Sequence, residues 1–250
     1  MKIIYVIVLL SSFTLFSQKT IHTFVALCDN VNQGIVPVPK NLGNGQDARN
    51  NLYWGALYGV KTHFKKSEAW ELIKVMPSNN SMILERILFK HKTSNTYLLA
   101  DAYDGKYIKE CTIDMLKAAA GDFEVSIKNN NSNLKFGSAS GLISYIGHNG
   151  LMEFEIDQTF TAKDSVVRDV IILACYSQGY FDFYLKQTKA NPLVWTTNLM
   201  APEAYTLKWA IDGWIKAETN EEIRSRAAKA YHYYQKCGIK GARRLLVTGY

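Results

Sequence analysis

The sequence is poor in cysteine and proline, and it contains no very long apolar run. Four cysteines among 250 residues are too few for the disulfide framework of a small secreted domain. Five prolines and 16 glycines exclude collagen-like and low-complexity architectures. No Walker loop and no Gly-x-Gly-x-x-Gly pattern occurs, which argues against nucleotide binding. The histidines lack the closely spaced partners of zinc sites, so we expect neither a metal ion nor a cofactor.

The composition is that of an ordinary globular protein. Apolar residues make up 48% of the chain and charged residues 20%, which is enough for one large domain or two small ones. No internal repeat or long linker marks a second domain. The formal net charge is +7, but Lys and Arg are scattered, in pairs at most. The basic stripe typical of nucleic-acid binding is not visible, and we expect no nucleic-acid partner.

The first 18 residues have the layout of a cleavable secretory signal peptide. Lys2 provides a short positive region, and a mostly apolar span of 14 residues, 3–16, precedes Ser17 and Gln18. A membrane-spanning helix needs about 18 or more apolar residues, so an uncleaved tether is the less favoured interpretation. We therefore expect a secreted or periplasmic protein with no membrane contact beyond this segment, and a single domain over residues 19–250.

Apolar periodicity predicts strands that alternate with helices after residue 20. The expected strands are 21–27, 82–89, 96–100, 142–146, 166–174 and 193–197. The expected helices are 48–60, 68–74, 107–120, 181–189, 202–214 and 220–236, with polar loops at 34–45 and 129–133. Several strands are apolar at nearly every residue, as in sheets covered on both faces. The pattern predicts an α/β protein with a mostly parallel sheet between two layers of helices.

Two of the most apolar strands end in residues capable of chemistry. Residues 142–146 run into His148, and residues 170–174 run into Cys175. If these strands are parallel neighbours, their carboxyl ends meet at the edge where α/β proteins bind ligands. An imidazole beside a thiol favours the reactive thiolate, and backbone N–H groups there can stabilise an oxyanion. The competing interpretation is an inert buried cysteine and a hydrogen-bonded histidine at a strand end.

The residues around both positions resemble a known family. Ser144-Tyr-Ile-Gly-His148-Asn-Gly150 and Ile172-Leu-Ala-Cys175-Tyr-Ser-Gln-Gly-Tyr-Phe181 resemble the two catalytic blocks of the caspase-fold (clan CD) cysteine peptidases, especially the legumain-like branch. The next block, Val194-Trp-Thr-Thr197-Asn-Leu-Met-Ala-Pro-Glu203-Ala-Tyr205, resembles the strand and loop that help build the family's primary specificity pocket. Phe24-Val-Ala-Leu-Cys-Asp-Asn30, with Gln46-Asp-Ala48, resembles the family's first strand and helix start.

The resemblance covers about residues 21–215 and implies a three-layer α/β/α caspase-like fold, with a helical extension from about residue 216. It implies hydrolysis of a protein or peptide substrate, with Cys175 as nucleophile and His148 as general acid and base. It places Asn30 where a residue supports the histidine. The residues that it places at the substrate pocket are Thr197, Asn198 and Glu203.

The chain departs from the family directly after the histidine. The family has glycine there, and the N–H of that glycine forms part of the oxyanion hole. Here Asn149 intervenes and Gly150 is displaced by one residue. A backbone N–H survives this change, so we expect Asn149 and Gly150 to provide the oxyanion support.

Three functions stay open at this point. The first is an exported cysteine endopeptidase, and the second is a binding or scaffold module that kept the fold and lost catalysis, as the Asn149 departure suggests. The third is acyl transfer or peptide ligation, in which an amine replaces water as acceptor. The sequence does not indicate an oligomeric state. In an exported protein, the remaining cysteines allow one disulfide among Cys28, Cys111 and Cys237.

Overall fold

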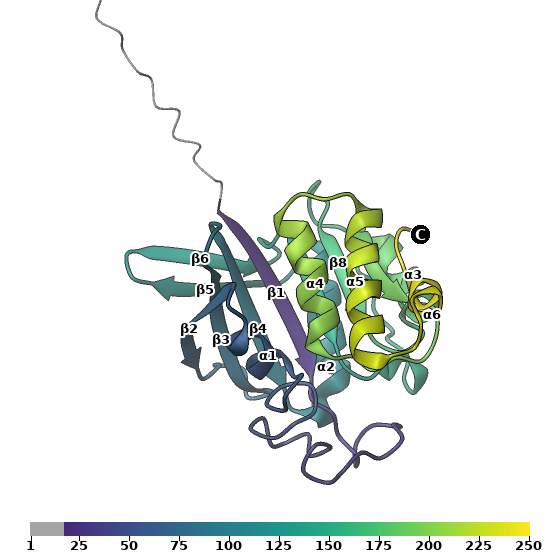
Figure 1. The fold of residues 1–250 in the computed structure, drawn as a ribbon. Coiled ribbons are helices and arrows are strands. Elements are labelled where there is room, and N and C mark those ends of the chain that lie inside the picture. Colours follow the sequence, from purple (N-terminus) through teal and green to yellow (C-terminus); the bar gives the residue numbers. More distant parts are fainter. Residues whose placement is uncertain (1–17) are drawn as a thin grey trace, which may run out of the picture.

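An eight-stranded sheet organises the part of the chain that the computed structural model describes, residues 18–250 (Figure 1). The expected signal peptide therefore lies outside the described residues, except for Gln18. The strand order is β10-β9-β8-β7-β1-β4-β3-β2. The strands are β1 (Lys19–Ala26), β2 (Trp70–Met76), β3 (Ile83–His91), β4 (Thr96–Tyr103), β7 (Leu142–Ile146), β8 (Asp169–Leu173), β9 (Asn191–Thr196) and β10 (Leu246–Val247).

The sheet is mostly parallel, as the sequence predicts. The five central strands, β9, β8, β7, β1 and β4, run parallel to one another. The other three strands pair antiparallel, β10 at one edge and β3 and β2 at the other. All carboxyl ends of the parallel strands therefore point to the same edge of the sheet.

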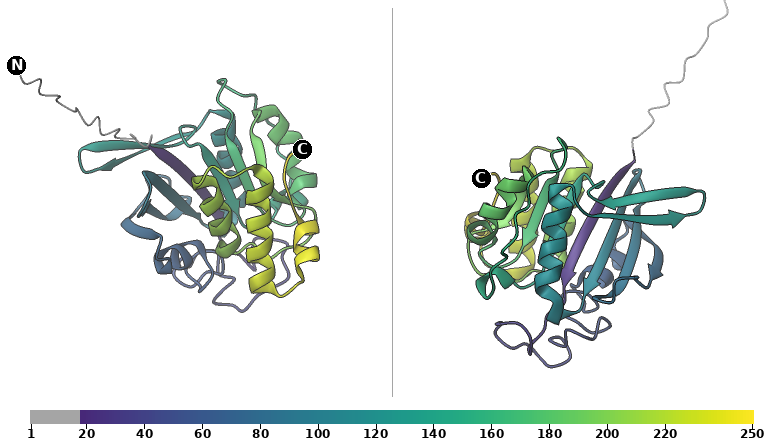
Figure 2. Two further views of the ribbon diagram at one scale, coloured as in Figure 1. Left: turned by 45° about the horizontal axis from the view of Figure 1, so that its top comes forward. Right: turned by 180° about the vertical axis from the view of Figure 1, so that it is seen from behind.

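Helices cover both faces of this sheet. The six α-helices of the described residues are α1 (Val60–Lys66), α2 (Ile108–Ala120), α3 (Ser177–Thr188), α4 (Ala204–Ile215), α5 (Asn220–Gln235) and α6 (Ile239–Leu245). α4 and α5 lie over one face together with α1 and α6, and α2 and α3 lie over the other (Figure 2). The chain is thus an α/β protein, compatible with three α/β/α layers.

The alternation of side chains along the strands builds two cores, one under each helical layer. In β1, Val25 belongs to the core below α4 and α5, whereas Phe24 and Ala26 belong to the core below α2 and α3. In β7, Ile146 and Tyr145 divide in the same way. Since both faces are buried, most side chains of these strands are apolar. Buried polar ones have partners, as Thr23 of β1 and Ser144 of β7 do in their shared hydrogen bond (2.8 Å).

The helix expected over residues 48–60 does not form. The chain makes turns here, and the short helix α1 begins only at Val60. The buried side chain of Asn51 accepts a hydrogen bond from the Cys28 N–H (3.0 Å) and donates one to the Cys28 carbonyl (2.8 Å). This pairing ties the segment to the end of β1, and a side chain at Gly55 would collide with the Arg49 carbonyl. Of the apolar residues that suggested a helix, Tyr53 and Val60 are buried, Leu52 and Ala56 are partly buried, and Leu57 is 53% exposed.

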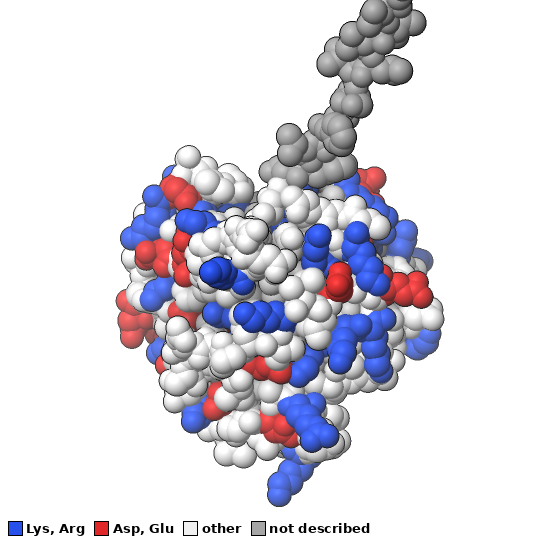
Figure 3. All heavy atoms as spheres, turned by 90° about the vertical axis from the view of Figure 1, so that its left-hand side faces the viewer, with Lys and Arg blue, Asp and Glu red and all other residues white. Residues whose placement is uncertain are grey.

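Residues 68–74 were also expected to be helical, but Trp70–Met76 form strand β2. The segment pairs antiparallel with β3, with a register shift between Leu72 and Lys74. Pairing with β3 satisfies the backbone, whereas so short an isolated helix is marginal in water. β2 is an edge strand, and charges of both signs, with more basic than acidic ones, are scattered over this side of the molecule (Figure 3). Charge and an irregular register both discourage pairing with another chain.

The expected polar loop at 129–133 is the tip of a hairpin that the sequence analysis missed. Strands β5 (Glu124–Asn129) and β6 (Ser132–Gly137) form a separate two-stranded sheet. Asn130 at the turn has a positive φ of 50°, a conformation that asparagine tolerates better than most residues. The hairpin buries Leu134 and Phe136 against Leu88 and Leu99 of the main sheet.

The segment after residue 216 is part of the domain as well as helical. α5 packs beside α4 over the sheet, and β10 pairs with β9 as the last strand. α5 begins with a capping box in which Thr219 and Glu222 exchange hydrogen bonds. The other expected elements are present with ends shifted by a few residues, β8 being shorter than predicted. No helix within residues 18–250 is both long and apolar enough to cross a membrane.

Candidate active site

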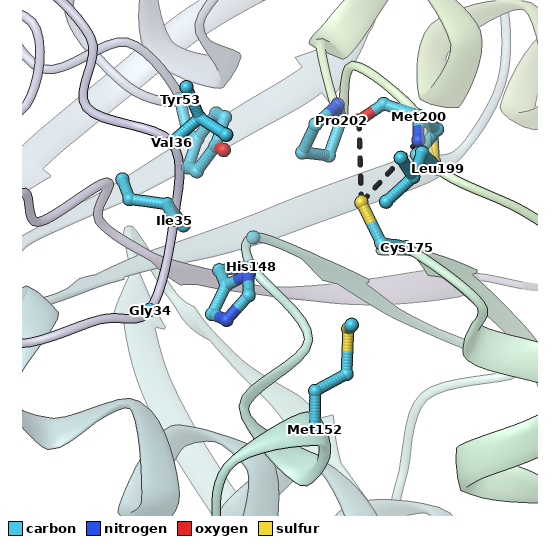
Figure 4. A pocket seen from close by; sticks show the side chains of 11 residues that line it. Gly34, Ile35, Val36, Tyr53, His148, Met152, Cys175, Leu199, Met200 and Pro202 are labelled. Carbon is cyan, nitrogen blue, oxygen red and sulfur yellow. Dashed lines mark hydrogen bonds between the residues drawn. The ribbon is translucent and has the colours of Figure 1, made fainter.

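The candidate site lies at the carboxyl ends of four adjacent parallel strands. β1, β7, β8 and β9 end at the same edge of the sheet, and the loop after each of them reaches one cavity. The cavity has a volume of about 270 Å³. Its lining residues are Gly34, Ile35, Val36 and Tyr53 after β1, Gly147, His148 and Met152 after β7, Cys175 after β8, and Leu199, Met200 and Pro202 after β9. The two residues predicted to carry the chemistry therefore share one cavity (Figure 4).

Cys175 lies in the sharp turn between β8 and α3. Tyr176, the next residue, has a left-handed conformation (φ 50°), which lets the chain enter α3 at Ser177 directly after the strand. Such a conformation is costly for a residue other than glycine and is concentrated at functional sites. The Met200 N–H donates to Cys175 Sγ (3.4 Å), and Sγ donates to the Met200 carbonyl (3.6 Å). The thiol is thus held at the cavity by the loop after β9.

His148 follows β7 and is almost fully buried. Its Nε2 is hydrogen-bonded to Oε1 of Glu153, and the same oxygen accepts the Gly34 N–H (2.8 Å). The Tyr145 hydroxyl donates to the His148 carbonyl (2.8 Å) and fixes the backbone. Among the hydrogen bonds of the described residues, none involves His148 Nδ1 and none joins the ring to Cys175. The ring and the thiol enter the same space from neighbouring strand ends (Figure 4).

Asn149 and Gly150, which were expected to provide oxyanion support, are not among the residues that line the cavity. Asn149 is fully buried, and its side chain donates to the Cys175 carbonyl (2.7 Å) while accepting the Leu151 N–H (3.2 Å). It therefore fastens the loop that carries His148 to the loop that carries Cys175. Gly150 packs so tightly that a side chain there would collide with Phe154.

Asn30 does not support His148. Its side chain pairs in both directions with the backbone of Val38, at 2.7 and 3.0 Å, and so shapes the loop after β1. The partner of the histidine is Glu153, which the sequence analysis missed. Glu153 lies five residues after His148 in an irregular segment, where no periodicity distinguishes it from the nearby Glu155.

The three residues expected at the substrate pocket, Thr197, Asn198 and Glu203, do not line the cavity, although they flank residues that do. Thr197 is exposed and donates to the Arg244 carbonyl (2.8 Å), and the Asn198 carbonyl accepts the Tyr176 N–H (3.0 Å). Glu203 accepts hydrogen bonds from Tyr205 (2.8 Å) and Gln235 (3.2 Å). Burial raises the pKa of Glu203, against these two hydrogen bonds, which lower it. The apolar residues between them, Leu199, Met200 and Pro202, line the cavity instead.

The other three cysteines have environments unlike that of Cys175. All four cysteines are free, so the disulfide considered for Cys28, Cys111 and Cys237 is absent. Burial raises the pKa of the Cys28 thiol to about 11 and that of Cys111 well above its usual value. Cys237 is exposed. Cys175 is thus the one cysteine of the chain that faces the cavity.

Within residues 18–250, no group of three or more His, Cys, Asp or Glu side chains is arranged to hold a metal ion. The site accordingly offers a thiol, an imidazole with a carboxylate partner, and an apolar wall. No protein-family model, no curated protein and no solved structure matches this chain.

Proposed function

We propose that the protein is a cysteine endopeptidase of caspase-like fold, acting on protein or peptide substrates after export. The observation that carries the proposal is that His148 and Cys175, at the carboxyl ends of adjacent parallel strands, line one cavity. The Glu153 carboxylate on His148 Nε2 supports it further. A carboxylate on one ring nitrogen favours the tautomer in which the other nitrogen, Nδ1, accepts a proton.

The chemistry follows from these roles. His148 Nδ1 takes the proton of Cys175, and the thiolate attacks the substrate carbonyl carbon to form a tetrahedral oxyanion. When the C–N bond breaks, the imidazolium returns its proton to the leaving amine, and a thioester with Cys175 remains. Water, deprotonated by the same nitrogen, hydrolyses the thioester and releases the free thiol. The Met200 N–H donates a hydrogen bond to the attacking sulfur and holds it at the cavity.

The test combines thiol reactivity with hydrolysis. We expect the purified protein to cleave peptides, Cys175→Ala to abolish cleavage, and His148→Ala to lower kcat/KM by about 10²- to 10⁴-fold. Alkylation by iodoacetamide, read by mass spectrometry, is expected to favour Cys175 over the exposed Cys237 at pH 6, and to lose this preference in His148→Ala. Cys237 serves as reference within the same molecule. Cleavage that persists in Cys175→Ala would contradict the assignment of Cys175 as the nucleophile.

One observation favours a second candidate, a binding module of the same fold without catalysis. Cys175 Sγ is bonded to the Met200 backbone, and the described hydrogen bonds do not join it to His148. Under this alternative Cys175 alkylates no faster than Cys237 at any pH, and peptides bind without being cleaved.

A further inference from the structure

The cavity beside Cys175 has an apolar wall. None of its lining residues in the described chain is Asp, Glu, Lys or Arg. We propose that this cavity selects a large, uncharged apolar side chain, aromatic or long aliphatic. Resting on the function proposed above, this is the side chain of the residue whose carbonyl carbon Cys175 attacks.

The size of the cavity suits such a side chain. A buried apolar cavity of about 150 Å³ is enough to hold benzene, and this one measures about 270 Å³. A phenylalanine, leucine or methionine side chain therefore fits with room for part of the adjoining backbone. An alanine side chain would leave most of the wall without a partner, which weakens dispersion contacts.

Apart from His148 and Cys175, which carry the proposed chemistry, the ionisable groups nearby offer no partner for a charged substrate side chain. Glu153 is held by His148 and by the Gly34 N–H. Glu203 is turned toward Tyr205 and Gln235. Tyr53, in the wall, is a neutral phenol because burial raises its pKa well above the usual value. An aspartate or lysine side chain entering the cavity would lose hydration without gaining a counter-ion.

The mouth of the cavity gives independent support. Val36 is 87% exposed, Leu199 64% and Met152 40%. These three residues come from three different loops, yet all line this one cavity. Exposed apolar residues that gather at one place mark a binding surface, and a bound apolar side chain would remove them from water.

Affinity labels test this selectivity without requiring hydrolysis. The probes are chloromethyl ketones of N-blocked Leu, Phe, Asp and Lys, whose carbon–chlorine bond breaks as a thioether forms on the cysteine. Mass spectrometry gives the labelling rate of Cys175 relative to Cys237, so that the intrinsic reactivity of each probe cancels. We expect this ratio to be at least about tenfold higher for Leu and Phe than for Asp and Lys. A smaller difference, or no labelling of Cys175, would overturn the inference.

Two valines provide a matched pair of variants. Val31 and Val36 are both 87% exposed and lie in the same loop, but only Val36 lines the cavity. We expect Val36→Glu to reduce the preference for the Leu probe over the Lys probe by about tenfold, and Val31→Glu to leave it unchanged. Equal effects of the two substitutions would show that the cavity is not the selecting element.

Peptide hydrolysis is then read separately from labelling. Peptides that differ only at the residue before the scissile bond are expected to be cleaved at least about tenfold faster with Leu or Phe than with Asp or Lys. Selective labelling without any cleavage contradicts the peptidase function and leaves the apolar selectivity of the cavity standing. Cleavage with a charged residue preferred contradicts the selectivity and leaves the peptidase function standing.

Discussion

At the residue scale, the two ring nitrogens of His148 have different surroundings. Nε2 is bonded to Glu153, while Nδ1 has no hydrogen bond among the described residues. Because an ionised carboxylate only accepts hydrogen bonds, it stabilises the tautomer with the proton on Nε2. Nδ1 is then the nitrogen that can receive the thiol proton. Glu153 acts through His148 and is therefore a positioning residue. It also accepts the Gly34 N–H, and this hydrogen bond fastens the loop after β1 beside the site.

Replacing Glu153→Gln tests this role. The amide keeps an acceptor oxygen for Gly34 but can also donate to Nε2, which favours the unproductive tautomer. We expect kcat/KM to fall by at least about tenfold, with a changed pH profile of Cys175 alkylation. Glu155→Gln, an exposed neighbour, is the control. If both variants retain the activity and the pH profile of the parent, Glu153 does not position the histidine.

At the element scale, α5 supports the loop that forms one wall of the cavity. The Tyr231 hydroxyl accepts the Ala201 N–H (3.1 Å), and Gln235 donates to both Glu203 (3.2 Å) and Tyr205 (2.6 Å). The loop between β9 and α4 is therefore fixed by residues of α5 that lie 30 to 32 positions further along the chain. The residues after 216 thus belong to the site's framework.

Replacing Tyr231→Phe removes the acceptor of the Ala201 N–H and keeps the ring. We expect the loop to loosen, so that KM rises several-fold while the free energy of unfolding falls by about 1 kcal/mol. Tyr233→Phe is the matched control, because Tyr233 is 60% exposed on the same helix. Peptide kinetics and urea unfolding measure the two effects. A KM that rises equally in the control would indicate a general effect of the helix surface.

At the scale of the whole molecule, buried and half-buried histidines link stability to pH. Burial lowers the pKa of His22 and of His91, and it lowers the pKa of His63 from 6.5 to about 4. Lys208 lowers the pKa of His63 further, and Asp212 opposes this. Between pH 6.5 and their folded pKa values, these three histidines therefore bind fewer protons in the folded protein than in the unfolded chain. Stability is fully present above that pH and is lost as the pH falls toward the folded pKa values.

The consequence is a measurable acid sensitivity. We expect the free energy of unfolding from urea titrations to decrease steadily between pH 6.5 and about 4. His63→Gln removes one of the groups responsible and is expected to flatten this dependence without abolishing it. If the variant and the parent lost stability with the same slope, His63 would not contribute to the pH dependence.

Much of the central sheet follows from local sequence patterns. β1, β7, β8 and β9, with α2, α4 and α5, coincide with apolar runs or helical periodicity that burial on both faces enforces. His148 and Cys175 were predicted at neighbouring strand ends, and the structure brings both to one cavity. Local patterns succeed here because each strand buries its side chains whatever its neighbours are. The peptidase activity itself stays a prediction.

The remainder was decided by tertiary contacts. β2 takes its conformation from pairing with β3, and residues 48–60 from the anchoring of Asn51 to Cys28. Loops that follow four different strands line the apolar pocket. Glu153 reaches His148 because the segment after β7, to which both residues belong, folds back on itself. The apolar pattern alone predicted the buried central strands and placed His148 and Cys175 directly after two of them. Tertiary packing decided which residues surround His148 and Cys175, because the positions of loops depend on contacts between segments that are distant in the chain.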